Sequence, residues 1–166
     1  MQYKKEAYLV ASFFFVSSFK FQVSGFRFQV SGFKVMSRIE RFEDLVIFQK
    51  ARALCKDVYI LTEKEPWRFD TRFVQQIHAS VGSIMDNIAE GYERDGNKEF
   101  INFLYIAKGS CGEVRSQIIR ALDVGFIDEK TAQKIYNDCI NLNRFIYSLI
   151  KKLRESDIKG PKYKGE

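Results

Sequence analysis

The segment that most constrains the fold is a strictly spaced run of apolar residues in the last third of the chain. Apolar side chains recur there at alternating spacings of three and four residues. This spacing is the core seam of helical bundles and coiled coils, because it places every apolar side chain on one helix face. We therefore expect a long amphipathic helix, with Asp128 as its N-terminal cap. The seam consists of Ala132, Ile135, Cys139, Leu142, Ile146, Leu149 and Leu153.

Two helical patterns of similar length lie in the first half of the domain. The first runs from Asp44 to about Thr62 and is expected to end before Pro66, whose ring disfavours helical geometry in the preceding residue. The second begins near Asp70, and Gly91 is well placed to be its left-handed cap.

A third pattern is expected to begin with Asn97 as its cap and to close at Gly125. Together the four patterns predict an all-α, up-down four-helix bundle over residues 36–154. Glycine inside a helix costs roughly 1 kcal/mol relative to alanine, so small residues there suggest a close approach of two backbones. Such residues cluster at Ala79, Ser80, Gly82 and Ser83 in the second helix and at Gly109, Ser110 and Gly112 in the third.

A second apolar series flanks the seam of the last helix and leaves two interpretations open. Both series could pack inside one bundle, or the extra face could form a subunit interface with apolar residues of the first or third helix. The flanking series is Tyr136, Ile140, Tyr147 and Ile150, and the other residues are Phe48, Tyr59, Ile101 and Tyr105.

Residues 1–35 differ from the rest of the chain. From Val16 the sequence reads VSSFKFQ, VSGFRFQ and VSGFKVM, three near-copies of one seven-residue unit. A signal peptide leaves these repeats unexplained, a β-hairpin conflicts with the odd period, and Lys20 and Arg27 interrupt any membrane span. Our hypothesis is a translated DNA repeat upstream of the gene, with the native start at Met36.

The residue types present argue against an enzyme, a metal site and a cofactor. Three isolated cysteines favour a reducing, cytoplasmic location, and with His78 alone they supply too few ligands for a structural zinc site. His78 has no partner evident in the sequence, and no phosphate-binding glycine motif occurs. The polar residues Asp86, Asn87 and Glu90 could form an acidic site, or Asn87 and Glu90 could bond to loop backbone or to Arg94.

The net charge of +6 is unevenly distributed. Residues 1–35 contribute five basic residues and one acidic residue, or +4, which leaves +2 for the remainder. Basic residues gather at the end of the last helix and in a flexible tail, 155–166. There they could bind the phosphates of nucleic acid, or they could instead interact with the helix dipole and increase solubility. The candidate phosphate contacts are Arg115, Arg120, Arg144, Lys151, Lys152 and Arg154.

Three stretches resemble one protein family: FEDLVIFQKA at 42–51, SIMDNIAEGYER at 83–94 and KEFINFLYIAKGSCGE at 98–113. They are similar to the bacterial four-helix bundle proteins encoded in intervening sequences of 23S ribosomal RNA genes. The motif residues are Asn87, Glu90, Gly91, Arg94, Gly109 and Ser110.

The resemblance implies a homopentameric ring. It also implies a relationship to the accessory protein of diversity-generating retroelements, which binds a reverse transcriptase and nucleic acid. The leading hypothesis is a non-catalytic adaptor that binds RNA, DNA or a ribonucleoprotein through basic patches on an oligomer. The alternative is a protein-interaction module, such as a reverse-transcriptase accessory subunit, that does not bind nucleic acid directly.

Overall fold

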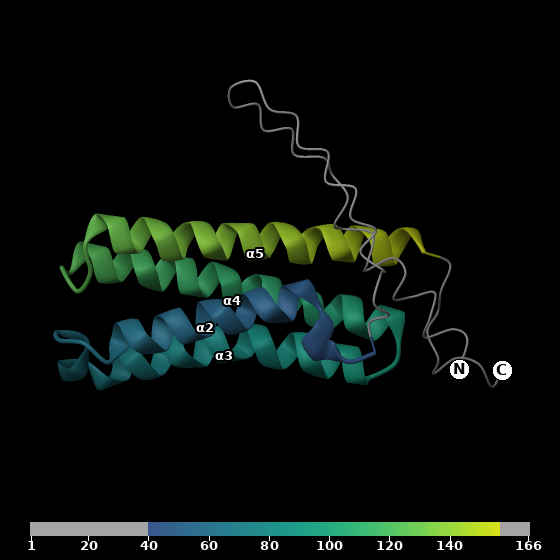
Figure 1. Cartoon of the computed structure of the whole chain (residues 1–166), viewed down its shortest axis with the longest axis horizontal. Coiled ribbons are helices and arrows are strands. Elements are labelled where there is room, and N and C mark those ends of the chain that lie inside the picture. The colour runs from purple at the N-terminus through teal and green to yellow at the C-terminus, as the bar shows by residue number, and fades with distance from the viewer. Residues whose placement is uncertain (1–39, 157–166) are drawn as a thin grey trace, which may run out of the picture.

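The computed structural model describes residues 40–156, which form four long helices joined by short connections (Figure 1). Short 3₁₀ helices, η2 (Phe42–Asp44) and η3 (Trp67–Phe69), precede the first and second long helices. The repeats before Met36, the proposed start at Met36 and residues 157–166 of the predicted tail lie outside the described residues. The long helices are α2 (Val46–Thr62), α3 (Thr71–Glu93), α4 (Asn97–Asp123) and α5 (Glu129–Glu155).

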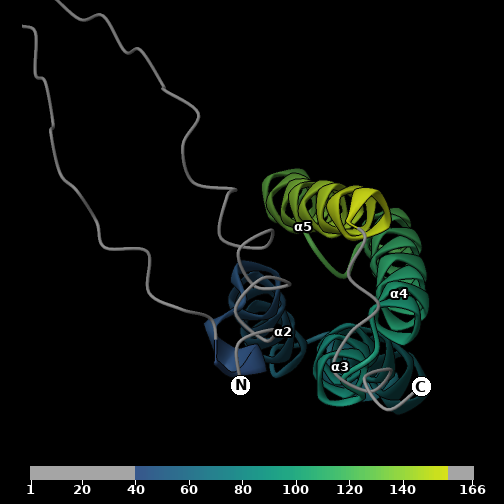
Figure 2. The same ribbon diagram turned by 90° about the vertical axis from the view of Figure 1, so that its right-hand side faces the viewer.

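Consecutive helices run in opposite directions, so the predicted all-α, up-down topology is confirmed. Seen end-on, α2, α3, α4 and α5 follow one another around a central core (Figure 2). Helix α4 packs against α3 and α5, and α2 packs against the same two helices. The short connections force this arrangement, because helices joined by a few residues pack as antiparallel neighbours.

The predicted seam of α5 forms its buried face. All seven apolar residues of the seam are buried, so the 3-4 spacing correctly identified this face. The flanking series divides between interior and surface: Ile150 is buried, whereas the side chain of Tyr147 is 54% exposed. Phe48 lies in the core and Tyr59 is exposed, so neither interpretation of the flanking residues describes all of them.

Several predicted helix ends are confirmed. The Asp128 carboxylate accepts a hydrogen bond from the Thr131 backbone N–H at 2.7 Å, as expected of an N-cap. Gly125 has a φ of +75° and follows the end of α4, where the Gly125 N–H donates to the carbonyl of Leu122. The Phe126 N–H donates to the carbonyl of Ala121, which completes a Schellman motif.

The expected caps at Gly91 and Asn97 are wrong. Helix α3 continues past Gly91 to Glu93, and the left-handed residue of the connection is Asp95, with a φ of +57°. Gly91 instead lies against α4, where an added Cβ would be 2.6 Å from the Cβ of Phe103. Gly96 is the N-cap of α4, while Asn97 is its first residue and bonds to α5.

The first long helix begins slightly later than expected. Asp44 belongs to η2, and α2 starts at Val46 after Leu45, whose extended backbone interrupts the helical geometry. Leu45 is buried, so this break turns an apolar side chain into the core.

The expected role of the small residues needs a correction. A Cβ added at Gly82, Gly109 or Gly112 would meet no atom of a neighbouring helix within 4 Å. At this level the contact between α3 and α4 includes two hydroxyl groups, since the Ser83 and Ser110 Oγ atoms are 2.9 Å apart. These three glycines lie on sides of their helices that no other helix covers at close range.

Candidate nucleic-acid interface

Three pairs of a cation and a tyrosine ring lie between α4 and α5. The Arg115 guanidinium lies 5.8 Å from the ring centre of Tyr136, and the Lys108 ammonium lies 5.9 Å from that of Tyr147. Arg154 lies 5.3 Å from the ring centre of Tyr105. Each pair joins one helix to the other. We call this surface the α4–α5 face and define it by Tyr105, Lys108 and Arg115 of α4 and Tyr136, Ile140, Arg144, Tyr147, Lys151 and Arg154 of α5.

The helical repeat explains why these residues share one surface. Residues three, four or seven positions apart lie on the same side of a helix. Arg144 is three residues before Tyr147 and seven before Lys151, so it lies beside both on α5. On α4, Lys108 follows Tyr105 by three residues and precedes Arg115 by seven.

The α4–α5 face is electropositive. Five of its defining residues are cationic, and Glu155 is an acidic side chain at its border. The side chain of Lys151 is 69% exposed, and its ammonium lies 3.9 Å from a carboxylate oxygen of Glu155, one turn later. A salt bridge as exposed as this contributes little to stability, so it leaves Lys151 accessible to a phosphate group. Arg115 is half-buried, and its Nε atom is buried without a hydrogen-bond partner among the described residues.

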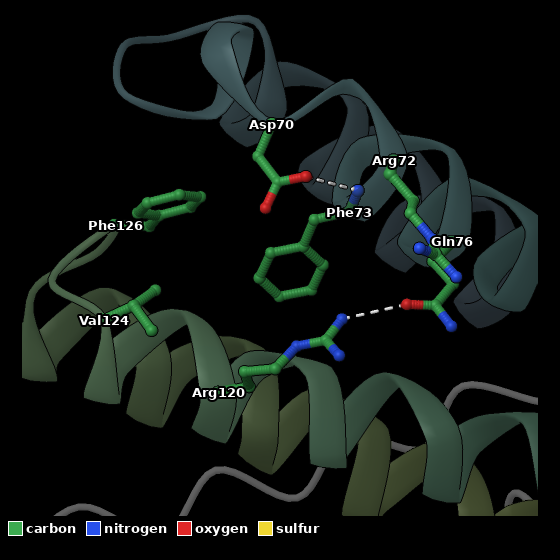
Figure 3. A pocket seen from close by; sticks show the side chains of 7 residues that line it. All are labelled: Asp70, Arg72, Phe73, Gln76, Arg120, Val124 and Phe126. Carbon is green, nitrogen blue, oxygen red and sulfur yellow. Dashed lines mark hydrogen bonds between the residues drawn. The ribbon is translucent and has the colours of Figure 1, made fainter.

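The structure therefore brings together four of the six candidate phosphate contacts: Arg115, Arg144, Lys151 and Arg154. Arg120 lies elsewhere, on the side of α4 that meets α3. Its guanidinium donates to Gln76 Oε1 at 3.0 Å and lies 3.9 Å from the ring centre of Phe73 (Figure 3). Arg120 lines a cleft of about 420 Å³ with Asp70, Arg72, Phe73, Gln76, Val124 and Phe126.

Lys152 also lies away from the α4–α5 face. It is half-buried and follows Phe145 by seven residues, so it shares the side of α5 that carries the Phe145 ring. The Lys50 ammonium of α2 lies 4.7 Å from the centre of that ring. Lys152 thus belongs to the boundary between α2 and α5.

The polar residues of the family motif around the end of α3 bond to other side chains and backbone groups of the bundle. Arg94 forms an ion pair with Glu90 one turn earlier, as expected, and its guanidinium lies 4.9 Å from the ring centre of Phe103. Asn87 differs from expectation, because its amide donates at 2.7 Å to the carbonyl of Ser83 within the same helix. These bonds satisfy polar groups close to the α3–α4 contact. In the same motif, Ser110 is buried and Gly109 is exposed.

His78 has the partners that its sequence neighbours did not reveal. Its ring stacks on Tyr59 with centres 3.8 Å apart, and its Nε2 lies 2.7 Å from Thr62 Oγ1. Burial lowers the pKa of His78, which favours the neutral imidazole. The three cysteines are free, and Cys111 and Cys139 are buried.

Within residues 40–156, no group of three or more histidine, cysteine or acidic side chains is arranged to hold a metal ion. In that same part of the chain, no helix has the length and apolar character needed to cross a membrane.

Lys108 is the member of the α4–α5 face that sequence reasoning missed. The sequence indicates the tyrosines as part of an apolar surface, but it does not show their pairing with cations. The signal was the recurrence of Tyr105, Lys108 and Arg115 on one side of α4. It becomes meaningful only once that side is known to border α5.

The sequence matches the family described as 23S rRNA-intervening sequence protein over residues 43–148. No curated protein matches it. One solved structure with the same fold is a protein of unknown function from the S23 ribosomal protein family of Bacteroides thetaiotaomicron. That protein is 24% identical in sequence, and the superposition has a TM-score of 0.59 and covers 64% of this chain and 96% of the other. Because the family match spans more than half of the sequence, this chain belongs to the 23S rRNA-intervening sequence protein family.

Proposed function

We propose that this protein is a non-catalytic adaptor that binds nucleic acid through the α4–α5 face of an oligomer. The observation that carries the proposal is the convergence of Arg115, Arg144 and Arg154 with two lysines on one surface. Clustered cations bind nucleic acid because each phosphate contact releases a condensed counterion. The family's connection with ribosomal RNA genes is consistent with an RNA or a ribonucleoprotein as the target.

Repetition of the α4–α5 face in an oligomer would supply enough cations for tight binding of nucleic acid. One copy of the α4–α5 face offers five cations, which is few for tight binding at physiological salt. In a symmetric ring the same face recurs on every subunit, and linked contacts strengthen one another without any new type of interaction. The sequence resemblance supports a homopentamer, which would present the face five times.

The proposal is tested by measuring affinity at two salt concentrations. Fluorescence anisotropy with a structured RNA and a duplex DNA would be recorded at about 50 mM and about 200 mM salt. The mass of the protein in solution would be determined by native mass spectrometry. We expect binding that weakens steeply with salt. The double variant Arg144→Glu/Lys151→Glu should show a smaller salt dependence, by about one unit of slope for each phosphate-binding cation that is removed.

The matched control is Arg52→Glu/Lys56→Glu. Both residues are exposed on α2, away from the α4–α5 face, and the control changes the net charge by the same amount. If both double variants weaken binding equally, total charge rather than this face governs affinity. If the folded oligomer binds neither nucleic acid at about 50 mM salt, the proposal is wrong.

A second candidate function is favoured by the outer side of α4. The side chain of Ile106 is 51% exposed, and Gly109 lies exposed three residues later, so an apolar, small-residue surface faces outward. Such a surface suits protein contact, either between subunits or with a partner such as a reverse transcriptase. Ile106→Ser would then lower the mass in solution or abolish partner binding, whereas Arg144→Glu/Lys151→Glu would leave both unchanged.

A further inference from the structure

The tyrosines of the α4–α5 face form an ordered row. Because α4 and α5 are antiparallel, Arg115 meets Tyr136, Lys108 meets Tyr147 and Tyr105 meets Arg154 at three successive levels. These levels on α5 are eleven and seven residues apart. At the rise of an α-helix, the row spans about 27 Å.

Two rings of the row are accessible to a ligand. Tyr147 is 54% exposed and Tyr105 is 37% exposed, although the apolar seam of α5 is fully buried. The cations lie 5.3 and 5.9 Å from the ring centres, close to the outer limit of roughly 6 Å for cation–π attraction. The rings are therefore held only weakly by their cations, and a flat ligand can stack beside them.

This combination of rings and cations distinguishes single strands from duplexes. In a duplex the base faces are stacked on one another, so a protein meets chiefly phosphates and base edges. A single strand exposes base faces, and proteins that bind it without sequence preference combine a positive groove with aromatic side chains. A duplex can be bound by cations and phosphate-contacting hydroxyls alone, without any stacking on the tyrosine rings.

We propose that the α4–α5 face binds single-stranded nucleic acid, with bases stacked on Tyr105 and Tyr147. Arg144 and Lys151 lie beside Tyr147 and contact the phosphates. This inference rests on the proposed function and deepens it, because it names the form of nucleic acid that the face selects. A row of about 27 Å accommodates a short run of bases, in keeping with sites of roughly 4–16 nucleotides in other single-strand binders.

The test compares two probes on the full-length protein. One is a labelled oligouridylate of about 20 nucleotides, long enough to fill such a site, and the other is a duplex RNA of the same length. We expect the wild-type protein to bind the oligouridylate more tightly than the duplex at equal salt. Equal or weaker binding of the single strand overturns the inference without any variant being needed.

Variants then assign the preference to the rings. Tyr105→Leu/Tyr147→Leu keeps apolar bulk but removes stacking, and it should weaken oligouridylate binding by about fivefold or more per ring while leaving duplex binding unchanged. Tyr105→Phe/Tyr147→Phe keeps the rings and should bind as the wild type does. Tyr59→Leu, at an exposed tyrosine of α2, is the matched control and should have no effect.

The outcomes separate this inference from the proposed function. Salt-dependent binding of both probes that is insensitive to the leucine double variant overturns single-strand stacking and leaves the adaptor function in place. A folded protein that binds neither probe at about 50 mM salt overturns both.

Discussion

His78 of α3 and Thr62 of α2 are joined by a short hydrogen bond, with 2.7 Å between Nε2 and Oγ1. The Thr62 hydroxyl also lies within bonding distance of the carbonyls of Val58 and Tyr59, at 3.1 and 3.0 Å, and can donate its one proton there. With the proton placed there, the imidazole donates from Nε2 to Thr62 Oγ1; in the other tautomer the hydroxyl donates to Nε2 instead. The bond ties the end of α2 to the first half of α3.

The first prediction concerns pH. Burial lowers the pKa of His78 in the folded protein, so the unfolded chain binds a proton more readily than the folded one. The free energy of unfolding should therefore fall as the pH drops below about 6.5, the ordinary histidine pKa. Urea titrations of the wild type and of His78→Gln between pH 7.5 and about 5 would measure this.

The variant isolates the contribution of His78, because it is the only histidine in the chain. His78→Gln should show a shallower decline in stability than the wild type over the same pH range. Parallel curves for the two proteins would mean that His78 does not respond to burial. Thr62→Val, which removes the buried hydroxyl, should cost about 1 kcal/mol of stability at neutral pH.

The second prediction compares two helical glycines. Gly91→Ala would place a Cβ 2.6 Å from the Cβ of Phe103, so α3 and α4 would have to separate. We expect it to lower the free energy of unfolding by about 1–3 kcal/mol. Gly109→Ala meets nothing within 4 Å and should raise it by up to about 1 kcal/mol, because alanine is the better helix former.

Chemical denaturation of the two variants beside the wild type measures both effects. Equal changes in the free energy of unfolding of Gly91→Ala and Gly109→Ala would mean that helix propensity alone governs both sites. A lower solution mass for Gly109→Ala, with the stability gain absent, would place Gly109 in a subunit contact.

These glycines also illustrate how far sequence reasoning extends. The seam from Ala132 to Leu153 and the cap at Asp128 depend on neighbours within one helix, and both were predicted correctly. Gly91 was misassigned because a glycine near a helix end serves equally as a cap or as a contact. Phe103, which decides between them, lies on another helix.

The candidate site was predictable to a similar extent. Arg144, Lys151 and Arg154 could be selected from charge and position on α5 alone. Lys108 could not be selected, because its place on the α4–α5 face depends on which side of α4 borders α5. Arg120 was selected for its charge, yet the structure places it beside Phe73 and α3.

The third prediction concerns thiol reactivity. Burial raises the pKa of Cys111 and of Cys139 to about 12, so neither forms an appreciable thiolate near pH 8. Cys55 is half-buried, and its pKa is raised by burial and by the charge of Asp86. We expect iodoacetamide to modify Cys55 first, and the other two at the rate of global unfolding.

Peptide mass spectrometry after timed alkylation distinguishes the three sites. Adding urea should bring the rates at Cys111 and Cys139 up to that of an unfolded thiol. Modification of either one as fast as Cys55 under native conditions would contradict their burial in the core.

The last prediction concerns Asn97, which links the start of α4 to the end of α5. Its amide donates to the carbonyl of Leu153 at 2.9 Å and to Ser156 Oγ at 3.3 Å. The carbonyl of Leu153 belongs to the last turn of α5, where carbonyl groups have no backbone partner within the helix, and it also accepts a hydrogen bond from the Ser156 hydroxyl at 2.8 Å. Asn97→Ala removes this bond and should lower the free energy of unfolding by about 1 kcal/mol.

Hydrogen exchange locates that effect. Amides of the last turn of α5, over residues 150–156, should exchange faster in Asn97→Ala, while those in the middle of α5 keep their protection relative to global unfolding. Asn137→Ala is the control, because Asn137 is exposed and its side chain bonds to that of Gln133, one turn earlier in α5. Unchanged exchange at the end of α5 in Asn97→Ala would show that packing of Leu153, rather than this amide, holds the last turn against α4.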